Sequence, residues 1–187
     1  MGFRSRQEML SGALGMDGRL AVFFWLMSIP VSNDPQAEGV NAARADFNHR
    51  LTLTQSALQY QNKFIGYETR ATFSFDQLMG RFNPVLDLSL SNKGAVWAGA
   101  GLYQQLDLPF GDHTFFAGFS FIPGLYFKGN DVDLGHTVEF RSGIEFGYRA
   151  DNGLQFSISY DHRSNAELGR INPGLESVAF RVSKSLY

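Results

Sequence analysis

The chain has 187 residues, of which 44% are hydrophobic, 14% aromatic and 18% charged. This composition is too apolar for a disordered chain, and the length suits a single domain. The formal net charge of -2 excludes the basic surface that nucleic-acid binding requires, and the absence of cysteine excludes disulfides and thiolate metal sites.

The N-terminal region has the order of a secretory signal. Three arginines precede the apolar run Leu20–Val31, and a polar stretch follows it. The run is shorter than the ~20 residues that a membrane-spanning helix needs. We therefore predict a cleaved signal or targeting segment over 1–37, a lead-in over 38–49 and the folded part over 50–187. A buried N-terminal helix is the alternative interpretation of the run.

Beyond residue 50, apolar and polar residues alternate in one segment after another, which is typical of β-strands. The clearest segments are 138–149 and 154–162. The tight turn Asp151-Asn152-Gly153 separates them, because Asn and Gly tolerate the positive φ that such hairpins require. Further strands are predicted at 50–60, 64–76, 82–91, 95–108, 113–127 and 175–187.

We predict an all-β fold, namely an eight-stranded antiparallel transmembrane β-barrel. The strands have the length and even count of a small outer-membrane barrel, and the aromatic content suits interfacial girdles. In lipid the apolar face must point outward, so charges such as Glu139 and Arg141 would fill the interior. A soluble lipocalin-like barrel with an apolar lumen would reverse this sidedness and is the structural alternative.

The same strand count orients the barrel. Both termini of an even-stranded barrel lie on the periplasmic side, where the turns are short. The turn at 151–153 then faces the periplasm, and the long connection 163–174 lies at the outer surface. His162 marks the outer end of its strand.

Polar residues interrupt the apolar stripes of the last two strands. By alternation His162 and Ser164 share one presumed lipid face, and Glu176 shares the same face of the next strand. Ionisable groups that face lipid cost free energy, so they are functional candidates. A serine becomes a nucleophile when an imidazole takes its proton and a carboxylate orients that imidazole, so these residues predict an esterase triad. Asn165 is a candidate amide donor to the oxyanion.

The alternative interpretation is that these are ordinary polar residues at the rim of a non-catalytic barrel of the adhesin or porin-like kind. The three remaining histidines have no metal-ligand spacing. They are His49, His113 and His136. We predict no metal and no cofactor.

Two short motifs, HRSNA at 162–166 and NPGLE at 172–176, resemble the PagL-type lipid A 3-O-deacylases. These are outer-membrane β-barrel enzymes that hydrolyse an ester-linked acyl chain of lipopolysaccharide. The resemblance is tight over 162–176 and looser over about 85–187.

The resemblance implies roles for individual residues. His162 corresponds to the general base, Ser164 to the nucleophile and Glu176 to the third member of the triad. Asn165 and Asn172 correspond to residues that support the site.

We therefore expect a bacterial outer-membrane serine esterase that hydrolyses the 3-O-linked acyl chain of lipid A. Another lipid A ester or a phospholipid is the alternative substrate. The expected partners are lipopolysaccharide and the lipids of the outer membrane, with a homodimer as an open alternative and no nucleic acid.

Overall fold

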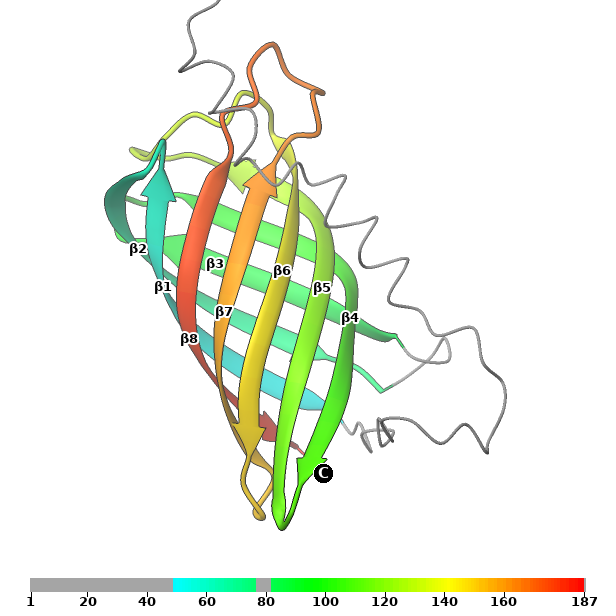
Figure 1. Cartoon of the computed structure of the whole chain (residues 1–187). Coiled ribbons are helices and arrows are strands. Elements are labelled where there is room, and N and C mark those ends of the chain that lie inside the picture. The colour runs from blue at the N-terminus through cyan, green and yellow to red at the C-terminus, as the bar shows by residue number, and fades with distance from the viewer. Residues whose placement is uncertain (1–48, 77–81, 187) are drawn as a thin grey trace, which may run out of the picture.

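The described residues form a closed barrel. The computed structural model describes residues 49–76 and 82–186. Over these residues, eight antiparallel strands close into one sheet (Figure 1). The strands are β1 (Arg50–Tyr60), β2 (Lys63–Ser74), β3 (Asn83–Ser91), β4 (Val96–Phe110), β5 (His113–Phe127), β6 (Val138–Arg149), β7 (Leu154–Ser164) and β8 (Leu175–Ser185). The predicted fold class is confirmed. The predicted signal segment and almost all of the lead-in lie outside the described residues.

The strand bounds follow the predicted alternation closely, with two differences that matter. β4 ends at Phe110, two residues later than predicted, because Pro109 and Phe110 still pair with Thr114 and His113 of β5 beside the turn. β7 continues to Ser164, which pairs with Phe140 of β6. The connection predicted to begin at residue 163 therefore begins at Asn165. No helix in the described part of the chain has the length and apolar character needed to cross a bilayer.

The two ends of the barrel differ in their connections. The connections 128–137 and 165–174 lie together at one end, here called the loop end (Figure 1). The short turns 111–112 and 150–153 lie at the opposite end, here called the turn end. Arg50 pairs with Ser185 at the turn end, so β1 begins and β8 finishes there. The loop end is the one that the strand count predicts to face outward.

The sidedness of the wall is that of a membrane barrel. Outward side chains are apolar and exposed, with Ile158 at 64% and Phe146 at 58%. Inward side chains are polar and buried, and they include Arg141 at 1% and Asp161 at 2%. A lipocalin-like barrel with an apolar lumen would have apolar side chains inside and polar side chains outside, so this alternative is wrong.

Buried ion pairs fill the loop-end half of the interior. Arg163 donates to both carboxylate oxygens of Glu68, at 3.1 and 2.8 Å. Arg141 donates to Glu68 at 3.1 Å and also pairs with Asp87. The Trp97 ring contacts both guanidinium groups, whose central carbons lie 4.8 and 4.7 Å from its centroid. These charges are paired, as burial requires.

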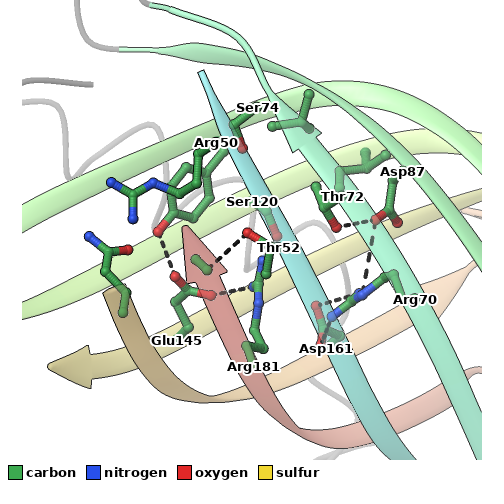
Figure 2. A pocket seen from close by; sticks show the side chains of 15 residues that line it. Arg50, Thr52, Arg70, Thr72, Ser74, Asp87, Ser120, Glu145, Asp161 and Arg181 are labelled. Carbon is green, nitrogen blue, oxygen red and sulfur yellow. Dashed lines mark hydrogen bonds and ion pairs between the residues drawn. The ribbon is translucent and has the colours of Figure 1, made fainter. Parts of the chain in front are cut away.

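A second polar cluster occupies the middle of the barrel (Figure 2). Arg70 binds Asp161 at 3.1 Å, and Glu145 pairs with Arg181 and accepts a hydrogen bond from the Tyr103 hydroxyl at 2.5 Å. The cavity between these side chains has a volume of about 20 Å³, which is room for about one water molecule. The interior is thus packed, and chemistry on a lipid has to take place on the outer wall or at an end.

Candidate active site

β7 is anchored from inside the barrel at the level of the predicted site. Asp161 and Arg163 point inward and hold Arg70 and Glu68 respectively. Because successive side chains of a strand alternate between faces, these ion pairs turn the residues beside them outward. His162 and Ser164 therefore stand on the lipid-facing wall at the loop end.

His162 and Glu176 are cross-strand neighbours on this outer wall. They are directly paired between β7 and β8. The imidazole Nδ1 lies 3.4 Å from Glu176 Oε1, and the two side chains are 15% and 27% exposed. The distance is long for a hydrogen bond, but catalytic contacts are often loose in a site without substrate. The carboxylate is placed where it can fix the tautomer and orientation of the imidazole.

Ser164 lies one step further toward the loop end on the same face. It is 7% exposed and pairs with Phe140 of β6. Residues two apart on a strand are ~6.5–7 Å apart along the chain. Among the described residues, Ser164 makes no hydrogen bond to His162. The backbone therefore brings the Ser164 hydroxyl and the His162 imidazole to one face, while contact between them requires side-chain rotation.

Asn165 ties together the two long connections at the loop end. Its side-chain nitrogen donates to the carbonyl oxygens of Leu134 at 2.8 Å and Ile171 at 2.7 Å. Its backbone N–H donates to Asn172 Oδ1 at 3.0 Å. The side-chain nitrogen thus has two carbonyl partners in this structure, and the predicted oxyanion role of Asn165 stays a prediction. The two asparagines contact each other through the Asn165 N–H, and the supporting role predicted for both stays a prediction.

Gly174 lies next to the imidazole of His162 and leaves no room for a larger residue. The sequence did not predict this contact. Its φ is +71°, and a Cβ built on it would lie 3.0 Å from His162 Cε1 and 3.6 Å from Glu176 Oε1. The sequence Asn172-Pro173-Gly174 is typical of a turn. Its contact with the triad depends on how the turn lies over β7, which a local pattern does not specify.

We expect Gly174→Ala to lower esterase activity by about 10- to 100-fold, because the added methyl displaces the imidazole from its place between Ser164 and Glu176. The measurement is turnover of an acyl ester in detergent. Gly153→Ala is a matched control: Gly153 also has a positive φ, +75°, but nothing lies within 4 Å of its added Cβ. Equal losses in both variants would assign the effect to backbone strain and contradict the prediction.

The described residues contain no group of three His, Asp or Glu side chains that could hold a metal ion. At this level of the outer wall, β7 and β8 present the imidazole of His162, the carboxylate of Glu176 and the hydroxyl of Ser164. This set is suited to acyl transfer.

Comparison with known proteins identifies the family. The sequence profile described as lipid A 3-O-deacylase (PagL) matches residues 41–185. The chain belongs to the PagL family. The crystal structure of the outer membrane enzyme PagL matches the fold with a TM-score of 0.60 and 16% sequence identity, covering 72% of this chain and 98% of that one. No curated protein sequence matches the chain.

Two further solved barrels are less similar to this PagL-family chain. A de novo designed transmembrane β-barrel matches with a TM-score of 0.49 and 9% identity, covering 74% of this chain and 96% of that one. Neisserial surface protein A matches with a TM-score of 0.46 and 8% identity, covering 74% and 96% of the two chains.

Membership of the PagL family supports three of the predictions. The chain is a bacterial outer-membrane protein, its family is one of lipid A deacylases, and lipid A is the substrate that the family implies. The homodimer that was left open as an alternative has no support among these matches.

Proposed function

We propose that the chain is a serine esterase that removes the 3-O-linked acyl chain of lipid A, with Ser164 as nucleophile, His162 as general base and Glu176 as the group that orients His162. The observation that carries the proposal is the contact between His162 and Glu176 on the lipid-facing wall, with Ser164 on the same face. Polar groups on a surface that contacts lipid are costly, so their convergence there calls for a function.

The reaction follows from these positions. Ser164 Oγ attacks the carbonyl carbon of the acyl ester while His162 takes its proton. The bond from that carbon to the sugar oxygen breaks, and the protonated imidazole gives its proton to the departing hydroxyl. Water then attacks the acyl-enzyme, with His162 again as base. This step releases the fatty acid and regenerates the Ser164 hydroxyl. Glu176 stabilises the imidazolium that forms in both steps.

The location supports a membrane lipid as substrate. The triad lies at the loop end, which the strand count places at the cell exterior, and lipopolysaccharide occupies the outer leaflet there. The ester can therefore approach along the wall without leaving the membrane. His162 and Ser164 flank the inward Arg163, so the site is attached to the rigid part of the barrel rather than to a loop.

The direct test is to incubate the detergent-solubilised protein with lipid A and to record the mass spectrum of the product. We expect the loss of one 3-O-linked acyl chain and the appearance of the matching fatty acid. Loss of an acyl chain from another position, or hydrolysis of phospholipid alone, would change the substrate assignment. Unchanged lipid A and phospholipid would favour the non-catalytic barrel.

A further inference from the structure

Ser142 stands on the side of His162 opposite to Glu176. It belongs to β6 and pairs directly with His162 of β7, which in turn pairs with Glu176 of β8. By alternation it points to the outer wall, with the inward Arg141 before it on the strand. His162 is therefore flanked on one level of the wall by a hydroxyl and a carboxylate.

A hydroxyl at this place is unexpected in the stripe to which it belongs. The other outward residues of β6 are apolar or aromatic. They are Val138, Phe140, Ile144, Phe146 and Tyr148. Ser142 is only 8% exposed, and its hydroxyl has no hydrogen-bond partner among the described residues. The hydroxyl is not among the fully buried unsatisfied groups, so it is accessible and can hydrogen-bond to a molecule that binds at this wall.

The orientation of the imidazole directs its other edge toward Ser142. Nδ1 faces Glu176 Oε1 at 3.4 Å, on the β8 side. Cδ2 and Nε2 lie across the ring from Nδ1, so they face the β6 side. Directly paired residues have Cβ atoms ~4.5–5.5 Å apart, whereas a residue two along the strand is ~6.5–7 Å away. The Ser142 hydroxyl is thus at least as close to His162 by backbone placement as Ser164.

Hydrolysis of the acyl-enzyme requires a water molecule, although the site faces lipid. A bound water needs about two to four polar partners. When Ser164 carries the acyl group and Glu176 is occupied by His162, the polar groups on the β6 side of the imidazole are His162 Nε2 and the Ser142 hydroxyl, whereas Gln59 of β1 lies beyond Glu176 on the other side.

We propose, on the basis of the esterase function above, that Ser142 binds the water that hydrolyses the acyl-enzyme. The Ser142 hydroxyl and His162 Nε2 hold this water between them. Its oxygen attacks the acyl carbon, one of its protons passes to Nε2, and the bond from the acyl carbon to Ser164 Oγ breaks. The proton then returns from Nε2 to Ser164 Oγ, and the fatty acid leaves.

The test compares Ser142→Val with Ser142→Thr in the full chain in detergent micelles. The two replacements have nearly the same shape, but only threonine keeps a hydroxyl, so a folding defect does not decide the result. With p-nitrophenyl decanoate, we expect Ser142→Val to release a stoichiometric burst of nitrophenol and then to turn over about 10- to 100-fold more slowly than Ser142→Thr. The intact mass of the valine variant should show the acyl adduct on Ser164.

A fluorophosphonate probe separates acylation from hydrolysis, because its reaction with the nucleophile needs no water. Ser142→Val and wild type should label at the same rate and on Ser164. Thr69→Ala is the control for a lost outward hydroxyl, since Thr69 lies on β2 and bonds to Gln55 away from the triad. It should leave both labelling and turnover unchanged.

Equal turnover in Ser142→Val and Ser142→Thr would overturn this inference alone. Labelling of Ser142 itself in the wild type would make Ser142 the nucleophile, which would overturn this inference and also the role of Ser164 in the proposed function. A wild-type protein that neither labels nor hydrolyses the ester overturns the proposed function, and this inference falls with it.

Discussion

Ser164→Ala is expected to abolish lipid A deacylation, with a loss of at least about 10³-fold in turnover. The proposed reaction passes through an ester on Ser164 Oγ, and alanine offers no atom to form it. His162 could still activate water directly, so a small residual rate is expected. The fold should survive, because Ser164 is at the end of β7 and its hydroxyl supports no contact among the described residues.

The measurement is the initial rate of fatty-acid release from lipid A, together with the heat-modifiable gel mobility that reports a folded barrel. Ser177→Ala is a matched control, since Ser177 follows Glu176 on β8 but is buried on the interior face. That variant should retain most of the activity. Retained activity in Ser164→Ala would reject Ser164 as nucleophile, and equal loss in both variants would trace the effect to a disturbed wall.

The architecture could be predicted from sequence because its cause is local. The alternation of apolar and polar residues indicates each strand, and turn residues indicate each hairpin. In an antiparallel meander the strands are then neighbours in the order of the chain. To predict which face of the strands points inward, we had to assume whether lipid or water surrounds the barrel. The buried pairs of Arg141 and Arg163 with Glu68 explain why the inward charges are acceptable.

Only part of the candidate site could be predicted from the sequence. Alternation placed His162, Ser164 and Glu176 on one face, and a motif resemblance suggested their roles. Cross-strand register is non-local, so the pairing of Ser142 with His162 could not be read from either strand alone.

The contacts of the loop end were also beyond local pattern. Asn165 reaches Leu134, a residue of another connection, and Gly174 lies beneath His162 because of how its turn folds back. Such contacts depend on the packing of two loops that are separate in sequence. The prediction of Asn165 as an oxyanion donor considered its chemistry without these partners, and it stays a prediction.

The second large effect concerns stability. Glu68→Ala is expected to lower the free energy of unfolding by about 3–5 kcal/mol, since it leaves two buried guanidinium groups without their shared carboxylate. Glu68 is 3% exposed and accepts hydrogen bonds from Arg141 and Arg163. Asp87 still compensates Arg141. Within the described residues Arg163 has no ion pair other than that with Glu68, although it interacts electrostatically with Glu139, so it carries the larger share of the cost.

Urea unfolding of the barrel in detergent micelles or lipid vesicles measures this effect through the loss of heat-modifiable mobility. Asp151→Asn removes an exposed carboxylate at the turn end and should change stability by less than about 0.5 kcal/mol. Activity should fall in Glu68→Ala even where the barrel is folded, because Arg163 lies between His162 and Ser164 on β7. Unchanged stability would show that water compensates Arg163 inside the barrel, and unchanged activity would show that the outer wall keeps its geometry without this internal anchor.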